Sequence, residues 1–300
     1  MTTAPLTSPP RVQRLRSVVR HCLAESRPVV QIVFLMRFVV GAVCAVSDGD
    51  DWSVPGVLVG ALAMTCAVMA AYLLNGVMDI AEDRANGSQR PIARGDLPVR
   101  VAAGVVWFLS GVALFLAVFV SGEFWLVALS LCMGYAYSVP PLAAKRRTAT
   151  SAATVIVLGA SSYLAGAVSA GGEIPRGPLL FCGLLALWMG FVGAVTKDLS
   201  DITGDRAGGR RTIAVVYGER AARMFAAVSA VVLGGAGLLL GLHTGPALLA
   251  GAVPLALGAG WVVLRCLWPD ANRARGPYRA FMVTQYAANT GLAAGLLVGG

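Results

Sequence analysis

Long apolar segments recur along the whole chain and constrain its fold more than any other feature. A helix needs about 18 or more mostly apolar residues to cross the hydrocarbon core of a bilayer. Because lipid offers no hydrogen bonds to the backbone, spanning segments of this kind must be helical. We therefore predict an all-α polytopic membrane protein with about nine transmembrane helices. The segments lie near 29–47, 54–78, 99–120, 123–141, 150–170, 178–198, 221–242, 246–268 and 278–298.

The charge content agrees with this class. Only 13% of the 300 residues are charged, whereas 57% are hydrophobic, and a soluble domain carries roughly 25% charged residues. The net charge of +9 could by itself suggest a nucleic-acid partner. Its distribution follows membrane topology instead, so we expect the lipid bilayer and no nucleic acid as a partner.

Basic residues concentrate on one predicted side of the membrane. All but two of the 24 Lys and Arg residues lie in the N-terminal arm or at the loops after the second, fourth, sixth and eighth segments. The exceptions are Arg37 and Arg176, while the loop after the first segment is acidic, with Asp48, Asp50 and Asp51. The positive-inside rule then predicts a basic cytoplasmic arm over residues 1–28, followed by a membrane domain over 29–300.

Two acidic clusters stand at the ends of apolar segments on this cytoplasmic side. In the first, Asn75, Asp79 and Asp83 are four residues apart, a spacing that places them on one face of a helix. In the second, Asp201 and Asp205 are again four residues apart, and Asp198 lies three residues before Asp201, so it can share the same face. Clustered carboxylates repel one another unless a cation neutralises them. Mg²⁺ suits such a site because it accepts a few carboxylates together with substrate phosphates.

The residues that follow the two clusters also resemble each other. Residues 83–87 read DRANG and residues 205–209 read DRAGG; RPIA at 90–93 and RTIA at 211–214 then align with a one-residue gap. Solvated acidic residues at a membrane interface would explain one cluster. They do not explain two clusters with the same four-residue spacing, on the same side of the membrane and with similar loops after them. We therefore interpret the pair as a duplicated motif, which consists of a helix end, an acidic cluster and a glycine-containing basic loop.

Two facing acidic clusters with nearby Arg and Lys residues favour chemistry on a diphosphate. Metal ions and cations stabilise the charge that develops on a diphosphate leaving group. If the organic part is a long allylic chain, the apolar bundle can hold it, and loss of diphosphate produces an allylic cation. A second substrate, or an alkene of the same chain, then captures this cation.

These motifs, in this order, resemble the UbiA superfamily of intramembrane prenyltransferases from about Glu25 to Gly218. The matching residues are Arg27-Pro28, Asn75/Asp79/Asp83 as an NxxxDxxxD motif, the RPIARG stretch at 90–95, Tyr135, Tyr137-Ser138, Pro140-Pro141, Lys145-Arg146, and Asp201/Asp205 with Gly204, Thr212 and Gly218. The resemblance implies nine helices around a central cavity, a Mg²⁺-bound isoprenyl diphosphate, and prenyl transfer to a lipophilic or aromatic acceptor.

Two positions depart from the family pattern. Gly76 follows the motif Asn where members commonly carry Asp, and Ile80 stands where members that take 4-hydroxybenzoate usually carry Arg. The second departure disfavours a ubiquinone-type acceptor. It leaves room for another acceptor, or for none, as in UbiA-type terpene cyclases. A transporter that binds cations is the rival from another class, but such sites usually lie near mid-bilayer.

We therefore predict a Mg²⁺-dependent prenyltransferase in a bacterial plasma membrane, with its N-terminus and active-site opening cytoplasmic. Asp79, Asp83, Asp201 and Asp205 are the predicted catalytic residues, and together with Asn75 and Asp198 they form the predicted metal site. For the basic candidates, the alternative is a purely topological or ion-pairing role. The predicted substrate-binding residues are Asn75, Arg90, Arg94, Tyr137, Lys145, Lys197 and Arg211.

Overall fold

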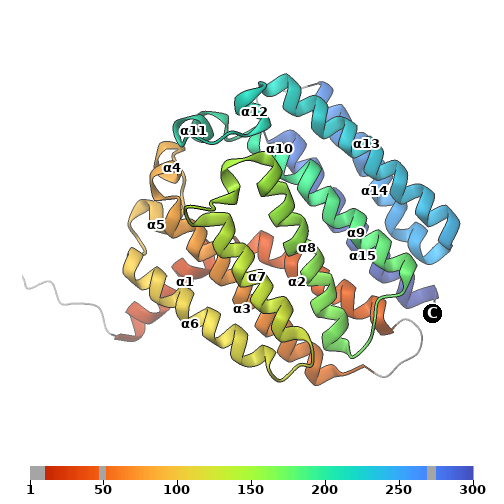
Figure 1. Ribbon diagram of the computed structural model, residues 1–300, viewed down its shortest axis with the longest axis horizontal. Helices are drawn as coiled ribbons and strands as arrows, with labels where there is room; N and C mark the ends of the chain where they lie inside the picture. Colours follow the sequence, from red (N-terminus) through yellow and green to blue (C-terminus); the bar gives the residue numbers. More distant parts are fainter. Residues whose placement is uncertain (1–10, 47–51, 269–274, 300) are drawn as a thin grey trace, which may run out of the picture.

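The computed structural model describes residues 11–46, 52–268 and 275–299, and over these ranges it contains helices and no strand (Figure 1). Seven stretches in these ranges are long and apolar enough to cross a membrane. Two further helices, α7 (Glu123–Ser138) and α15 (Gly276–Gly299), complete the bundle. The seven are α2 (Pro28–Val46), α3 (Val54–Met78), α6 (Val99–Ala117), α8 (Thr148–Ala170), α9 to α10 (Arg176–Asp198), α13 (Glu219–Thr244) and α14 (Pro246–Leu267).

The predicted all-α membrane fold is confirmed, and each predicted segment matches one of these helices to within a few residues. The sixth segment is not one uniform helix. It consists of α9 (Arg176–Trp188), a wider π-helical turn at Met189–Gly193, and α10 (Ala194–Asp198). Such turns inside α-helices are frequent at functional sites, and here the turn directly precedes α10, whose last residue, Asp198, begins the second acidic cluster.

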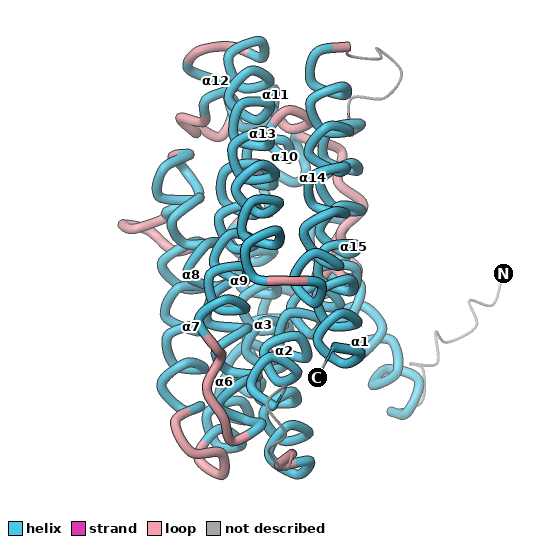
Figure 2. The backbone as a smooth tube through the Cα atoms, turned by 90° about the vertical axis from the view of Figure 1, so that its right-hand side faces the viewer, coloured by secondary structure: helices cyan, strands magenta, loops and turns pink. Residues whose placement is uncertain are grey.

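Small residues allow the central helices to approach closely. A Cβ atom at Gly41 of α2 would collide with the carbonyl of Tyr163 in α8, and one at Gly166 of α8 would collide with the carbonyl of Phe38 in α2. Backbone contact of this kind replaces the hydrophobic driving force that lipid cannot supply. The α2–α8 pair therefore forms the centre of the bundle, with α3, α6 and α7 on one side and α9 and α13–α15 on the other (Figures 1 and 2).

Four short helices gather at one end of the bundle (upper left and top in Figure 1). They form two pairs, α4 (Ile80–Ala85) with α5 (Pro91–Arg94), and α11 (Ile202–Ala207) with α12 (Ile213–Val216), and α4 contacts α11. Because each pair directly follows a spanning helix that carries an acidic cluster, the two clusters meet at this end.

The predicted N-terminal arm contains a helix, α1 (Arg11–Glu25), which packs against α3 and α5. Residues 1–10 of the arm lie outside the described ranges, as do the acidic loop residues Asp48, Asp50 and Asp51. Glu25 at the end of α1 contacts Arg90 and Ile92 at the start of α5, so part of the arm lies at the same end of the bundle as the acidic clusters.

Candidate active site

Each acidic cluster bends at its middle aspartate. Asp79 separates α3 from α4 with φ −103° and ψ 12°, and Asp201 precedes α11 with φ −118° and ψ 10°. The sequence predicts an uninterrupted helical face, and the structure differs because these angles fall in the bridge region beside the α-helical one. The four-residue spacing nevertheless persists. The amide of Asp83 donates to the carbonyl of Asp79, and that of Asp205 to the carbonyl of Asp201, each at 2.8 Å.

The loops after the clusters share a backbone conformation, which confirms the duplication. Gly87 and Gly209 have φ of 62° and 68°, values that glycine adopts without a steric penalty. The next residues close equivalent turns, since the amides of Ser88 and Arg210 donate to the carbonyls of Asp83 and Asp205 at 2.8 Å. The short helices α5 and α12 then begin at equivalent positions, so the structures align without the gap that the sequences suggest.

A cavity of about 150 Å³ brings the two clusters together between α2, α3, α8 and α10. Apolar and aromatic side chains form its deeper wall, among them Phe34, Leu158, Met189 and Phe281. Nine of the predicted site residues line this cavity, namely Asn75, Asp79, Asp83, Tyr137, Lys145, Lys197, Asp198, Asp201 and Asp205. The cavity thus combines a charged entrance with an apolar interior.

Buried cations neutralise the first cluster. The Lys145 ammonium, between α7 and α8, forms an ion pair with Asp79, and both side chains are less than a tenth exposed. Burial lowers the pKa of Lys145, while the charge of Asp79 opposes this shift. Arg90 pairs with Asp83 at 2.9 Å, so both carboxylates of this cluster are held by basic groups from elsewhere in the chain.

Arg210 connects the two clusters. Its guanidinium pairs with Glu82 and lies 3.5 Å from Asp79 and 3.4 Å from Asp205. Burial alone would lower the pKa of Arg210, but the hydrogen bond to Glu82 and the neighbouring carboxylates outweigh it, so the pKa is raised. Burial raises the pKa of Asp205, and Arg210 opposes that shift.

A carboxylate from α1 fills the space beside Gly76. A Cβ atom at position 76 would meet Glu25 Oε1 and the Arg90 guanidinium. Glu25 is fully buried, pairs with Arg90 at 2.7 Å and accepts a hydrogen bond from the amide of Ile92 at 2.9 Å. The absence of a side chain at Gly76 therefore makes room for Glu25, which brings a carboxylate close to the position where family members commonly carry Asp.

Three predicted substrate-binding residues lie outside the cavity lining. Arg90 is buried behind Asp83, Arg94 is exposed and pairs with Asp96 at 3.0 Å, and Arg211 is exposed beside Arg147. Contact of these three with substrate stays a prediction.

The cavity lining also includes polar and charged residues that are absent from the predicted set, among them Arg27, Glu82, Asn86 and Arg210. The duplication offers a signal for Arg210, because this residue stands five positions after Asp205, as Ser88 does after Asp83, and the amides of both close the same turn beside an acidic cluster. Arg27, at the α1–α2 junction, has a left-handed φ of 55°, which the sequence does not reveal.

The oxygen donors at the entrance fit a hard divalent cation. Asp205 Oδ2 is buried without a hydrogen-bond partner, and carboxylate and amide oxygens are suitable ligands for Mg²⁺. Among the described residues, no three acidic, His or Cys side chains already converge as a metal cage. Lys145 and Arg210 instead stand between the carboxylates. A bound metal would therefore share the entrance with these cations.

The fold and cavity define a multi-pass membrane protein with paired acidic motifs at the mouth of an apolar chamber. The chain belongs to the UbiA prenyltransferase family, whose model matches residues 34–284. It is thus a membrane prenyltransferase, as the sequence motifs predict.

Known proteins resemble the chain over different shares of its length. The chain is 31% identical over 258 residues to digeranylgeranylglyceryl phosphate synthase of Halobacterium salinarum, covering 83% of each protein. It is 32% identical over 177 residues to the probable chloroplastic homogentisate phytyltransferase 2 of Oryza sativa, covering 56% of this chain and 47% of the plant protein. It thus spans about half the length of the plant relative.

The structure also resembles a solved UbiA homologue from Archaeoglobus fulgidus, determined with GPP and Mg²⁺ bound. The TM-score is 0.69 at 18% identity, and the match covers 91% of this chain and 99% of the other. This similarity supports the fold of the whole bundle, including the last three helices, for which the sequence offers no motif.

Proposed function

We propose that this protein transfers an isoprenyl group from a Mg²⁺-bound isoprenyl diphosphate to a lipophilic acceptor and releases diphosphate. The observation that carries this proposal is the cavity of about 150 Å³, which all six residues of the two acidic clusters line together with apolar and aromatic side chains. The relatives support it, since one is named for a prenylated glyceryl phosphate and another for phytyl transfer to homogentisate. The Archaeoglobus homologue was determined with a prenyl diphosphate and Mg²⁺.

The charged entrance would hold the diphosphate. Asn75, Asp79 and Asp83, with Asp198, Asp201 and Asp205, would hold Mg²⁺, which supplies positive charge to the leaving group when bound. Lys145, Lys197 and Arg210 line the same entrance, and their charges would neutralise further phosphate oxygens. These cations are already held in place by the carboxylates, so little reorganisation is needed when charge develops.

The apolar interior would hold the prenyl chain during ionisation. The bond between the allylic carbon and the diphosphate oxygen breaks, and its electron pair leaves with the diphosphate. Phe34, Tyr72, Tyr137 and Phe281 line the cavity, and aromatic rings that present their faces to the allylic cation would stabilise it. The acceptor then donates an electron pair to the cation and loses a proton, which completes the transfer.

The membrane orientation belongs to the same proposal. Lys145, Lys197 and Arg210 lie at the end of the bundle that carries the acidic clusters, as does Arg90. The positive-inside rule places this end in the cytoplasm, and the Gly- and Ala-rich composition favours a bacterial plasma membrane.

The test measures diphosphate release by purified protein with geranyl, farnesyl and geranylgeranyl diphosphates in Mg²⁺. Asp79→Ala and Asp201→Ala are each expected to abolish release, whereas Asp96→Ala, which changes an exposed carboxylate outside the cavity, should retain it. Undiminished release by either cavity variant would contradict the metal-site assignment.

Product analysis then distinguishes transfer from cyclisation. Formation of a cyclic hydrocarbon or alcohol without any acceptor would replace the transferase proposal with a terpene cyclase. Cation transport by reconstituted protein without diphosphate release would favour the transporter.

A further inference from the structure

The exposed side of α1 carries an apolar stripe. Val12, Leu15, Val19 and Leu23 follow one another at intervals of three, four and four residues, which places them along one face of the helix. Each of these side chains is between 47% and 66% exposed. Because a contiguous apolar surface of this kind marks an interaction site, the stripe calls for an apolar surface or medium to cover it.

A different face of α1 is already packed against the protein. Cys22 is buried in one apolar cluster with Leu73 of α3 and Ile92 of α5. Glu25 is fully buried and pairs with Arg90 at 2.7 Å. The helix therefore cannot turn its apolar stripe toward the bundle without losing these contacts.

Arginines border the apolar stripe. Arg16 and Arg20 each directly follow a stripe residue, so they lie on the flank of the stripe that is farther from Cys22. Both arginines are exposed, as is Arg14. The sequence of residues 11–24 contains no Asp or Glu. An apolar stripe flanked by arginines is typical of a helix that lies in the membrane interface, with its charges at anionic head groups.

The position of α1 fits such an interface. The helix ends at Glu25, and the spanning helix α2 begins at Pro28. Figure 1 shows α1 at the margin of the bundle beside α5, at the end that carries the acidic clusters. This is the basic end of the protein, and anionic lipids attract basic segments next to a spanning helix. Residues 1–10 are a poor alternative cover, since Met1 and Leu6 are their only large apolar residues.

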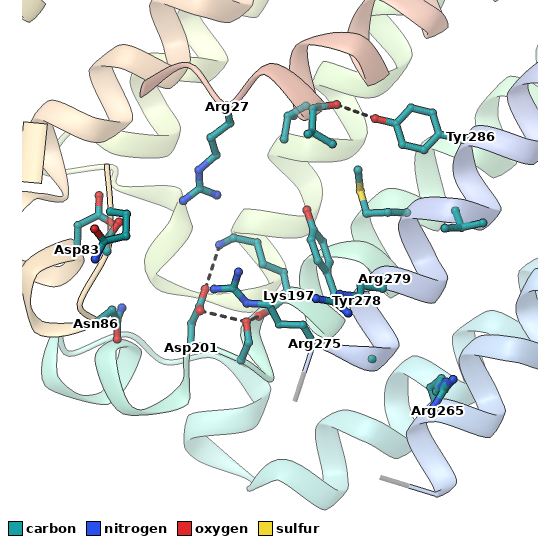
Figure 3. Close-up of a pocket in the computed structure, with 18 of the residues that line it drawn as sticks. Arg27, Asp83, Asn86, Lys197, Asp201, Arg265, Arg275, Tyr278, Arg279 and Tyr286 are labelled. Carbon is teal, nitrogen blue, oxygen red and sulfur yellow. Dashed lines mark hydrogen bonds and ion pairs between the residues drawn. The ribbon is translucent and has the colours of Figure 1, made fainter. Parts of the chain in front are cut away.

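The end of α1 is connected to the candidate active site at two points. Glu25 pairs with Arg90, which in turn pairs with Asp83 of the first cluster at 2.9 Å. Arg27, two residues after α1, lines the active-site cavity and also a larger cavity of about 980 Å³ beside it. Figure 3 shows Arg27 pointing into this larger cavity toward Asp201 of the second cluster.

The junction between α1 and α2 is short and internally hydrogen-bonded. The amide of Ser26 donates to the carbonyl of Cys22 at 2.9 Å, and Nε2 of Gln31 in α2 donates to the carbonyl of Ser26 at 2.8 Å. A change in the position of α1 therefore shifts Glu25 and Arg27, because no long loop separates the helix from them.

We infer that α1 binds the anionic head-group layer of the membrane around the bundle, and that this contact keeps the active site ordered. The apolar stripe enters the acyl boundary, while Arg16 and Arg20 bind lipid head groups. The bound helix then holds Glu25 against Arg90 and keeps Arg27 in the cavity wall. Anionic lipid consequently raises enzyme activity. This effect on activity rests on the proposed function, whereas the binding of α1 to lipid does not.

The test measures amide hydrogen exchange of residues 11–25 in the full chain, in nanodiscs of phosphatidylcholine with and without phosphatidylglycerol. The anionic lipid should slow exchange by about tenfold or more, because each arginine near an anionic surface strengthens binding. Arg16→Gln/Arg20→Gln should lose this response, and Arg16→Lys/Arg20→Lys should keep it, since the charge is retained. Arg100→Gln/Arg220→Gln, which removes two exposed arginines from α6 and α13, should respond as the wild type does.

Two results would overturn the lipid contact. Equal exchange by the wild type in both lipids would leave the stripe to a protein partner, and a response that persists in Arg16→Gln/Arg20→Gln would exclude these arginines. Leu15→Ser/Val19→Ser tests the apolar part. It should exchange faster than the wild type in both lipids, and unchanged exchange would show that the stripe does not enter the membrane.

Diphosphate release tests the connection to the active site. Wild-type release should be about threefold faster with phosphatidylglycerol, the gain that follows when the bound population of α1 rises from about a third to nearly all. Arg16→Gln/Arg20→Gln should show the phosphatidylcholine rate in both lipids. Equal wild-type rates in both lipids, beside a change in exchange, would overturn the connection. Failure of the proposed function is distinct, because no diphosphate would then be released in either lipid while the exchange result stands.

Discussion

Arg210 and Glu82 form an ion pair that joins the two acidic segments of the chain. Glu82 belongs to α4 after the first cluster, and Arg210 follows α11 after the second. The same guanidinium lies close to Asp79 and Asp205. One arginine therefore neutralises carboxylates from both copies of the duplicated motif. It also occupies the region in which a bound metal would add further positive charge.

Removal of this arginine should make stability depend on Mg²⁺. In Arg210→Gln the carboxylates of Asp79, Glu82 and Asp205 lose their shared partner, and the loss of one partner of a buried pair costs about 3 kcal/mol. We expect a lower melting temperature in EDTA and substantial recovery in millimolar Mg²⁺, because the metal replaces the missing charge. Thermal unfolding with and without Mg²⁺ measures this.

The matched control for this change is Arg206→Gln, which removes an exposed charge from α11. It should shift the melting temperature little in either buffer. If Arg210→Gln loses the same stability with and without Mg²⁺, Arg210 does not share a site with the metal.

Glu25 and Gly76 should behave as a coupled pair. Glu25→Ala removes a partner of buried Arg90 and leaves the Ile92 amide without its acceptor, which we expect to cost about 3 kcal/mol and most of the activity. Gly76→Asp alone should also destabilise, because Glu25 fills that space. In the double variant, the new carboxylate lies beside Arg90 and should restore about 2 kcal/mol, as a double-mutant cycle would measure.

A matched variant separates charge from volume in this cycle. Glu25→Ala/Gly76→Ala adds a Cβ atom without a carboxylate and should show no recovery. Equal recovery with Ala and Asp at position 76 would mean that packing, rather than a partner for Arg90, couples the two sites.

Gly204 and Asn86 should also be coupled, since they bring α11 and α4 into contact. A Cβ atom at Gly204 would collide with the Asn86 side chain. Gly204→Ala should therefore destabilise the protein by about 1–3 kcal/mol and reduce diphosphate release. Asn86→Ala in the same chain should relieve the collision and recover most of the loss. Gly183→Ala, where the new Cβ meets no atom within 4 Å, is the control, and a similar loss there would contradict the prediction.

Lys145 should contribute to donor binding through its charge. Lys145→Met keeps an apolar stem in a buried position but leaves Asp79 with Arg210 as its remaining ion-pair partner within the described structure. The KM for the isoprenyl diphosphate is expected to rise by about tenfold, the effect of one lost charge-assisted contact. Steady-state kinetics checks this. Arg146→Met, which changes an exposed neighbour, should leave the KM unchanged, and an equal effect of both variants would indicate a nonspecific charge effect.

The sequence by itself determined the class of the protein and the positions of the acidic residues. Hydrophobic runs located the spanning helices because segment length and apolarity act locally, and the lipid environment leaves few alternatives to a helix. The four-residue spacing placed Asp79 and Asp83, and likewise Asp201 and Asp205, on neighbouring turns for the same local reason. The duplication was also readable, since both copies retain similar residues after the aspartates.

Only the tertiary structure decided which cations and carboxylates meet. Sequence spacing ranks Arg210 no higher than Arg211, yet packing of α11 against α4 brings Arg210 to both clusters and leaves Arg211 exposed. Glu25 reaches Gly76 because α1 docks on α3 and α5, a contact between segments far apart in the chain. The physical reason is that ion pairs depend on side-chain positions a few ångströms apart, and these follow from how helices cross rather than from the periodicity within any one of them.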